Sequence, residues 1–153
     1  MGTGYTTLMY DDASLLDGIA DVGACRYDGI EIGLEKVRAA DPEAVAAQLD
    51  RYDLDLYLVM GEWLESDAAA DRVAEGAHLA GDLGAPFVGI LPPQRGHVED
   101  ETLDGWLRQV CEAADDAGVV PVVHHHGGTH VEGPDEVAAW LDRGPENLRL
   151  LWD

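Results

Sequence analysis

Short apolar runs recur along the whole chain, and helix-like stretches separate them. The runs, each typical of a buried strand, are Tyr5–Tyr10, Gly29–Ile32, Leu54–Met60, Phe87–Leu91, Val119–Val123 and Leu148–Trp152. Helix-start and helix-stop signals, such as Asp41-Pro42 and Gly84, predict five helices over residues 12–22, 41–49, 66–83, 101–117 and 133–141. Strict alternation predicts an α/β fold of parallel strands joined by right-handed crossovers.

Two architectures fit this pattern, an open doubly wound sheet and a (β/α)8 barrel. No turn carries GxGxxG or GxxxxGK[ST], so nucleotide binding of those kinds has little support. A barrel needs about 250 residues and eight strands, whereas this sequence has 153 residues and six predicted strands. The prediction is a single (β/α) domain over 1–153, the N-terminal part of an incomplete TIM barrel. Pro121 is awkward inside a central strand and predicts an irregularity there.

Acidic residues are spread along the whole chain. There are 31 Asp and Glu residues against nine Lys and Arg residues, giving a net charge of −22, and Lys36 is the single lysine. Nucleic-acid binding needs a basic footprint, so the charge argues against such a partner. Spread acidity is typical of a halophilic surface, screened by high salt; a patch for a cationic partner is the alternative. No run approaches the roughly 18 apolar residues of a membrane span and no leader opens the chain, so a cytoplasmic protein without a membrane partner is expected.

Histidines gather directly after the fifth predicted strand, in HHHGGTHVE at residues 124–132. His124 and His126 should point to one face of the sheet and His125 to the other, because strand side chains alternate. The Gly-Gly turn would let Glu132 fold back toward the strand ends, where α/β proteins bind ligands. Imidazole with carboxylate is a ligand set for Zn, Mn, Fe, Co or Ni. The alternative is a polar loop with a chance run of histidines.

Three further residues lie in or after predicted strands. Asp153 ends the sixth strand, where a carboxylate is often functional, although it is also simply the last residue. Glu31 is a charged residue inside a buried strand, which costs several kcal/mol unless it is paired or faces a cavity. It is interpreted either as a rim carboxylate that binds sugar hydroxyls or as a salt-bridge partner of Arg26. Trp63 is either an apolar wall against a sugar or ordinary packing.

Four segments together resemble the xylose-isomerase-like TIM-barrel superfamily. They are YDGIEI (27–32), GAPFVGILPP (84–93), HHHGGTHVEGPDEV (124–137) and NLRLLWD (147–153). This superfamily includes sugar phosphate isomerases and epimerases, inosose dehydratase, hydroxypyruvate isomerase and endonuclease IV. The His-x-His-x-Gly-Thr-x-x-Glu arrangement is most similar to inosose dehydratase-like members. The net charge argues against an endonuclease IV-like activity.

The resemblance implies divalent-metal-dependent isomerisation, epimerisation or dehydration of a keto- or hydroxy-sugar. It implies that Glu132 and Asp153 hold the cation (Mn, Co, Zn or Mg) and that Glu132 or His126 moves the proton. His124, His126, Glu31 and Trp63 would contact a sugar or polyol substrate. The family's sixth-strand signature continues Asp-Thr-Gly-His, and the two ligands that follow have no counterpart here.

This departure leaves it open whether the chain itself is an enzyme. The expectation is that this chain alone is impaired and is rescued by assembly with a second chain; a homo-oligomer also remains open. The alternative is a non-catalytic binding half-barrel, or a degenerate gene product.

Overall fold

The computed structural model describes residues 2–152. The strands are β1 (Gly4–Thr6), β2 (Gly29–Gly33), β3 (Asp55–Trp63), β4 (Phe87–Leu91), β5 (Val120–His124) and β6 (Arg149–Leu151). The α-helices are α1 (Leu15–Ala24), α2 (Leu34–Ala39), α3 (Pro42–Tyr52), α4 (Asp67–Asp82), α5 (Asp100–Ala117) and α6 (Pro134–Arg143), and the short 3-10 helices η1 (Thr7–Met9) and η2 (Asp12–Ser14) follow β1. All strand pairs are parallel, in the order β1-β2-β3-β4-β5-β6. The predicted alternating α/β architecture is confirmed.

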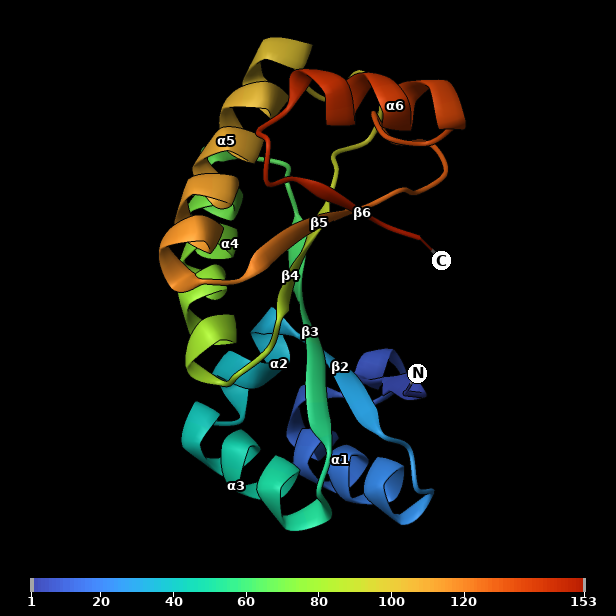
Figure 1. Cartoon of the computed structure of the whole chain (residues 1–153), viewed down its shortest axis with the longest axis vertical. Coiled ribbons are helices and arrows are strands. Elements are labelled where there is room, and N and C mark those ends of the chain that lie inside the picture. The colour runs from blue at the N-terminus through green and yellow to red at the C-terminus, as the bar shows by residue number, and fades with distance from the viewer. Residues whose placement is uncertain (1, 153) are drawn as a thin grey trace.

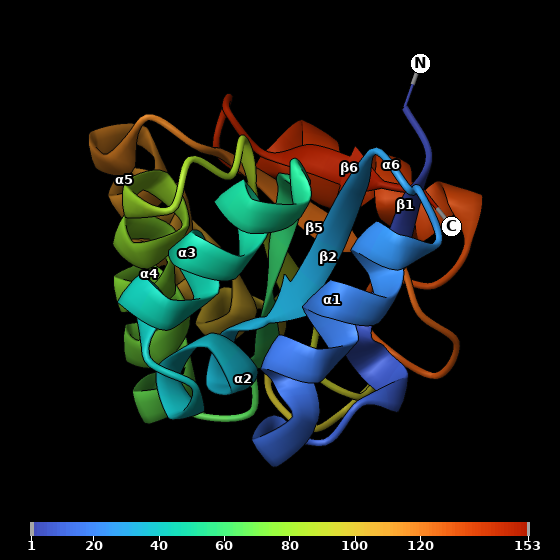
Figure 2. The same ribbon diagram turned by 90° about the horizontal axis from the view of Figure 1, so that it is seen from below.

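The sheet is curved, and the helices lie on its convex side (Figure 1). Figure 2 shows α1, α2 and α3 against one part of the sheet and α4 and α5 against the next. Within residues 2–152, β1 and β6 each pair with one strand only. The sheet is therefore six strands of a barrel wall with two free edges. No helix in this part of the chain is both long and apolar enough to cross a membrane.

The hydrophobic core lies between the convex face of the sheet and the helices. One cluster joins β2 and β3 to α1, α2 and α3 and extends to Val88 of β4 and to residues of α4 and α5. A second cluster joins Ile90 of β4 and Val123 of β5 to α4, α5 and α6. Ile30, Val88 and Ile90 are each 0% exposed beneath these helices. Burial of such a side chain contributes about 1.5–3 kcal/mol, so this layer supplies much of the stability.

Side chains that alternate with the core residues point to the concave side of the sheet, which we call the inner face. Glu31, Phe87 and Val122 line a cavity of about 560 Å³ there. The register of β2 against β3 shifts by one residue, so that Ile30 pairs with Leu56 but Glu31 pairs with Leu58. β3 thus carries one extra residue at this point, as in a β-bulge.

The first strand is shorter than the sequence predicts. Pairing stops at Thr6, and η1 replaces the expected continuation to Tyr10. Leu8 N donates to the Thr6 hydroxyl at 3.3 Å, while Lys36 Nζ donates to the carbonyl oxygens of Thr7 at 2.6 Å and of Tyr10. These contacts satisfy backbone groups of the turn. The prediction of a strand up to Tyr10 is wrong. The carbonyl groups of this turn bond to Lys36, and an apolar pattern gives no information on such a distant contact.

Two other local features differ from what the sequence predicts. The sequence does not predict α2, whose six residues are too short to show a helical period. Pro121 causes no irregularity, since it pairs with Val88 in an unbroken register. The N–H of Val120 donates to Pro86 O at 2.9 Å, on the side of the sheet where β4 lies. The backbone nitrogen of residue 121 therefore faces β6. Pairing with β6 starts only at Val122, and the N–H that proline lacks is not needed there.

Candidate functional site

Three aromatic side chains meet where two strands of the sheet end. His124 is the last residue of β5, His126 lies two residues further on, and Trp63 is the last residue of β3. The ring centroids of His124 and His126 are 5.8 Å apart, and those of Trp63 and His126 are 5.1 Å apart with an interplanar angle of 89°. Ligands of α/β proteins bind at this end of parallel strands. We call His124, His126 and Trp63 the ring cluster; it contains three of the predicted substrate-binding residues.

One nitrogen of the exposed His126 ring contacts the backbone of its own loop. Its Nδ1 lies 3.0 Å from the carbonyl oxygen of Gly127. A carbonyl oxygen only accepts, so Nδ1 carries the proton and donates it, and the neutral ring keeps Nε2 as its acceptor. His126 can therefore accept a hydrogen bond or a proton from a molecule bound at the ring cluster.

Thr129 fixes the loop that carries these histidines. Its buried hydroxyl donates to His126 O at 2.7 Å and accepts from Val131 N at 3.2 Å. His126 N donates to Val131 O at 2.9 Å, which closes the loop on itself. Gly128 has a φ of 81°, in the left-handed region that favours glycine. The turn that the Gly-Gly pair predicts is thus formed, and it holds His126 near the end of β5.

The loop after β4 lies beside this turn and is bonded to it. Arg95 N donates to Gly128 O at 2.9 Å, and His130 N donates to Pro93 O at 3.1 Å. The two loops therefore form one layer above the ends of β4 and β5. Backbone bonds between loops so far apart in the sequence limit the independent movement of either.

Glu132 is held by a guanidinium within this layer. Arg95 Nη2 donates to Glu132 Oε2 at 2.9 Å, and Arg95 Nη1 donates to Glu136. Glu136 also accepts from Gly133 N at 3.0 Å. The hydrogen bond from Arg95, followed by that from Gly133, lowers the pKa of Glu136 from 4.5 to about 2. Both carboxylates raise the pKa of Arg95, so the cation stays charged between them.

Glu132 lies on the α6 side of the sheet, together with His125. Both line a mainly apolar crevice of about 480 Å³ between β5 and α6. His125 also packs against Trp152, with ring centroids 5.0 Å apart. His125 thus lines the α6 side, although its ring also stacks beside that of His124, with centroids 6.0 Å apart. The structure does not bring Glu132 into the ring cluster.

A metal site is not formed by the residues that the structure describes. Between residues 2 and 152, no group of three or more His, Cys, Asp or Glu side chains could hold a metal ion. Glu132 is already bonded to Arg95. Asp153, the other predicted ligand, lies outside the described residues. The donor set of this part of the chain therefore does not fit a divalent cation.

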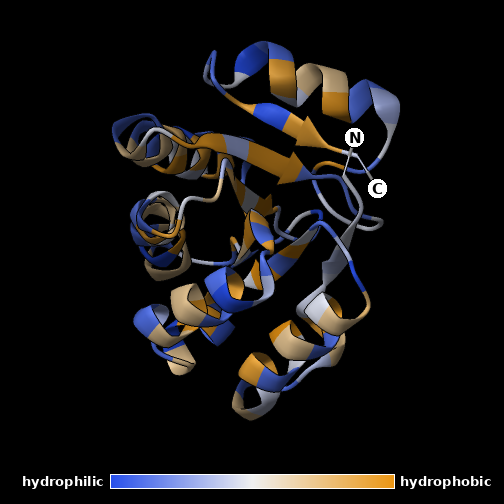
Figure 3. Cartoon of the chain, turned by 60° about the horizontal axis from the view of Figure 1, so that its bottom comes forward, coloured by the Kyte–Doolittle hydropathy of each residue, from blue (hydrophilic) through white to orange (hydrophobic). Residues whose placement is uncertain are grey.

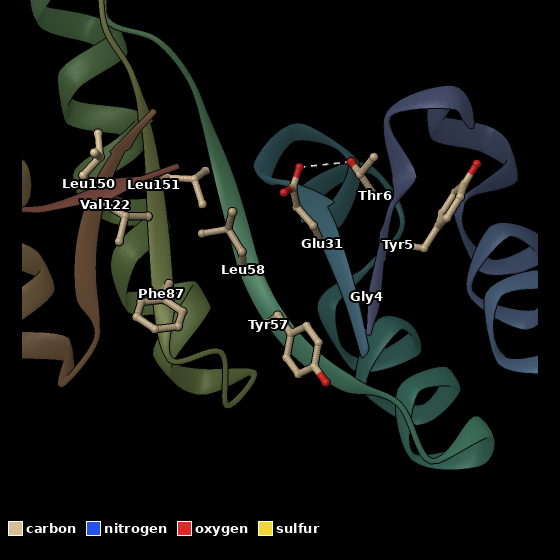
Figure 4. A pocket seen from close by; sticks show the side chains of 10 residues that line it. All are labelled: Gly4, Tyr5, Thr6, Glu31, Tyr57, Leu58, Phe87, Val122, Leu150 and Leu151. Carbon is tan, nitrogen blue, oxygen red and sulfur yellow. Dashed lines mark hydrogen bonds between the residues drawn. The ribbon is translucent and has the colours of Figure 1, made fainter. Parts of the chain in front are cut away.

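Glu31 faces the inner cavity and is not bonded to Arg26. Thr6 Oγ1 donates to Glu31 Oε1 at 3.0 Å (Figure 4). The carboxylate comes from β2 and its partner from the adjacent strand β1, so the bond spans the sheet near its free edge. The cost of a charge in a strand is reduced by this bond and by the open cavity. Between the two interpretations of Glu31, the structure favours a carboxylate that faces a cavity.

His130, the fourth histidine of the run, serves another purpose. It is buried, its Nδ1 lies 3.3 Å from Asp100 Oδ1, and its ring packs edge-on against Trp140. Asp100 also pairs with Arg143 at 3.3 Å. These contacts tie the loop to α5 and α6, so the role of His130 is structural.

Two residues that fix loops near the strand ends are not among the candidates that the sequence predicts. Arg95 and Lys36 each bind loop groups more than 25 residues away along the chain. Neither residue belongs to a motif or to a periodic pattern. Their charge in a strongly acidic chain is the one feature that sets them apart.

Comparison with known proteins addresses the fold. No protein-family model and no curated protein matches the sequence. Solved structures do match in three dimensions. A xylose isomerase-like TIM barrel/4-hydroxyphenylpyruvate dioxygenase fusion protein superposes with a TM-score of 0.79 at 18% identity, over 98% of this chain and 26% of that one.

Two shorter proteins match equally well. An AP endonuclease, family 2, from Brucella melitensis has a TM-score of 0.78 at 15% identity, over 100% of this chain and 69% of that one. A D-allulose 3-epimerase from Methylomonas sp. has a TM-score of 0.78 at 18% identity, over 98% and 62%. The chain therefore spans less than two thirds of the fusion protein and of the epimerase.

These matches define the fold class as a (β/α) TIM barrel of which six strands are present. The matching structures include one described as a xylose isomerase-like TIM barrel and two sugar epimerases, each 18% identical or less, so the likeness concerns the fold. The predicted fold class and the resemblance in fold are confirmed.

Proposed function

We propose that the ring cluster binds the hydroxyl groups of a sugar or polyol, on the substrate face of a barrel of the isomerase, epimerase or dehydratase type. The convergence of His124, His126 and Trp63 at the ends of β3 and β5 carries the proposal. Imidazole nitrogens donate and accept hydrogen bonds, and an indole ring offers an apolar surface for sugar carbons. One solved structure of this fold is a D-allulose 3-epimerase in complex with D-allulose.

His126 is the proposed proton carrier. Isomerisation requires a base that takes a proton from one carbon, with a proton returned to the neighbouring carbon. Epimerisation requires that a proton return to the opposite face of the same carbon. Nε2 of His126 is the acceptor of the neutral ring because Nδ1 donates to Gly127. Glu132 is the second candidate, but its carboxylate must first leave Arg95. The hydrogen bonds therefore favour His126 over Glu132.

Glu31 is proposed as a further substrate contact. It is half-buried in the inner face, and one of its oxygens accepts from Thr6. A carboxylate has about four acceptor positions, so the group keeps capacity for substrate hydroxyls. It would contact a part of the molecule that extends into the cavity.

Binding of a cation by Glu132 and Asp153 stays a prediction. The described residues do not form such a site, and Glu132 is paired with Arg95. The proposal for the ring cluster does not depend on a metal, and no reaction step is assigned to one here.

A role on DNA has less support, although an AP endonuclease shares the fold. The chain carries a net charge of −22, and phosphate binding needs exposed cations. On the face of the ring cluster, the guanidinium of Arg95 is already paired with two carboxylates. The charge distribution favours a neutral ligand.

Saturation-transfer NMR and calorimetry with D-allulose, D-fructose and myo-inositol test this function. We expect weak binding of at least one of them, reduced about tenfold by His126→Ala or Trp63→Ala, as for loss of a hydrogen bond or a packing contact. His78→Ala is the matched control, since His78 is exposed on α4 and far from the ring cluster in the fold. Equal binding by all three variants, or no binding at tens of millimolar sugar, would contradict the proposal.

A further inference from the structure

The last residues of β3 interrupt the regular pairing of the sheet. Two register pairs enclose the irregular point, Met60 with Gly89 and Trp63 with Leu91. Between these pairs β3 advances by three residues while β4 advances by two. Gly61 and Glu62 therefore lie opposite Ile90 alone, which is the arrangement of a β-bulge. Bulges of this kind change the direction of a side chain and are frequent beside active sites.

The bulge decides on which side of the sheet Trp63 lies. Gly61 points to the convex side, where a Cβ would lie 3.0 Å from a valine side chain of α4. Strict alternation from Gly61 would place Glu62 on the inner face and Trp63 on the convex side. The structure has the reverse arrangement, because Glu62 bonds to Arg72 of α4 and the Trp63 ring contacts His126. One extra residue thus brings Trp63 into the ring cluster.

Glu62 is held on the convex side by a bidentate ion pair. The strands are mainly apolar, whereas the helices mix apolar and polar residues (Figure 3), so a carboxylate at this point of β3 needs a partner on a helix. Arg72 Nε donates to Glu62 Oε1 at 2.6 Å, and Arg72 Nη2 donates to Glu62 Oε2 at 2.7 Å. Two such parallel bonds fix the direction of the carboxylate as well as its distance. The pair therefore ties the bulge to α4.

The residue that follows Trp63 is also held on the convex side. Leu64 is 0% exposed in the core between the sheet, α4 and α5, and its N–H donates to Leu91 O at 2.9 Å. At the bulge itself the two strands approach closely, since a Cβ on Gly61 would lie 2.7 Å from Gly89 O. With both neighbours of Trp63 held beneath the helices, its indole is directed to the opposite side, where the ring cluster lies.

We propose that Glu62 and Arg72 are positioning residues of the ring cluster. Their ion pair keeps the bulge in place, and the bulge directs the Trp63 indole to His126. Glu62 itself contacts no substrate, because its carboxylate lies on the far side of the sheet. This inference rests on the proposed function, since it names what orients the apolar wall that a sugar would meet.

The first test needs no sugar. The nuclear Overhauser effect (NOE) between the ring protons of Trp63 and His126 reports their contact, with ring centroids 5.1 Å apart. Glu62→Gln should abolish this NOE and shift the His126 ring resonances, because the amide is uncharged and cannot accept both bonds. The matched control is Asp104→Asn. Arg108 donates to Asp104 through the same two nitrogens, at 2.9 and 3.2 Å, but on α5, and its loss should leave the NOE unchanged.

The second test measures binding of D-allulose, D-fructose and myo-inositol by calorimetry. Glu62→Gln should weaken binding about fivefold, and Trp63→Ala about tenfold. The two changes together should be no worse than Trp63→Ala alone, because a positioning residue acts only through the group that it positions. The exchange Glu62→Arg with Arg72→Glu restores an ion pair at the same place and should recover both the NOE and the binding.

Two results would overturn the proposal. One is an unchanged NOE in a Glu62→Gln variant whose circular dichroism is native. The other is a loss of binding that adds to that of Trp63→Ala in the double variant. If Glu62→Gln does not fold, the exchange variant decides, since a folded exchange variant without the NOE contradicts the proposal. If the parent binds no sugar, the proposed function fails, while the NOE alone still shows whether the ion pair orients Trp63.

Discussion

The two faces of the same sheet have opposite surroundings. On the outer face, Val88 and Ile90 are completely buried beneath helices. On the inner face, Phe87 and Val120 are 40% and 37% exposed. Phe87, Val88 and Ile90 come from one strand of five residues, FVGIL, whose side chains alternate between the two faces. Both faces are apolar, but within residues 2–152 helices cover only the outer one.

This difference shows that a continuous apolar strand encodes two packing surfaces. Strands of parallel sheets are apolar on both sides because both sides are normally covered. The outer layer is complete here and accounts for the core. The inner face carries a cavity of about 560 Å³, and the ring cluster lies at the ends of β3 and β5. Mutations on the two faces should therefore have different consequences.

The largest expected effect comes from a cavity in the outer layer. Ile90→Ala should lower the free energy of unfolding by about 2–5 kcal/mol, because it removes a completely buried side chain. Phe87→Ala removes a larger side chain from the inner face but should cost less than half as much, since Phe87 keeps 40% of its surface exposed. Urea denaturation of both variants in the same buffer measures the difference. Equal losses would mean that the inner face is as well packed as the outer one.

A substitution of Lys36 tests what holds the turn after β1 in place. Its ammonium donates to three carbonyl oxygens of the turn after β1, those of Thr7, Leu8 and Tyr10. Lys36→Met keeps most of the apolar stem and should cost about 1.5–3 kcal/mol, the value of hydrogen bonds to a charged group. Hydrogen exchange should accelerate in residues 5–10 more than in the outer core. Uniform acceleration across the sheet would show that the lysine supports the whole fold and not this turn.

Much of the fold is predictable because it depends on local pattern. Alternating strands and helices identify a parallel α/β sheet, and alternation along β5 places His124 and His126 together. The position of Glu132 is not predictable in this way. It depends on Arg95, which lies 37 residues away and belongs to another loop. Lys36 bonds the turn that follows β1 from a similar distance along the chain. Long-range contacts of single charged side chains leave no period in the sequence.

Salt should stabilise the chain through its outer surface. The inner cavity is lined by one charged residue, Glu31, whereas the chain as a whole has an excess of 22 negative charges. Raising KCl shortens the screening length from about 10 Å at 0.1 M to 3 Å at 1 M. Exposed charge pairs are each worth about 0.2–1 kcal/mol, so we expect a gain on the order of 1 kcal/mol.

Thermal unfolding in KCl, compared with sucrose, measures this gain, because sucrose strengthens burial without screening charge. The double variant Asp115→Asn/Asp116→Asn, at two exposed positions of α5, should depend less on KCl. A stability independent of KCl would remove the halophilic interpretation of the composition.

The smallest expected effect is an acid-dependent loss at the layer above β4 and β5. The pKa of Glu136 falls from 4.5 to about 2 in the folded protein because Arg95 and the Gly133 N–H bond its carboxylate. A depressed pKa means that the carboxylate stabilises the folded state above pH 4.5, and that this contribution is lost as the pH falls toward 2. Glu136→Gln should therefore be slightly less stable than the parent at pH 7 and should converge with it near pH 2. Denaturation midpoints from pH 7 to pH 2 measure the convergence, with Asp135→Asn, an exposed neighbour, as the control. A difference in midpoint that stays constant from pH 7 to pH 2 would show that the glutamine amide destabilises the fold for a reason other than charge. It would also show that Arg95 does not hold the two loops together by its ion pairs.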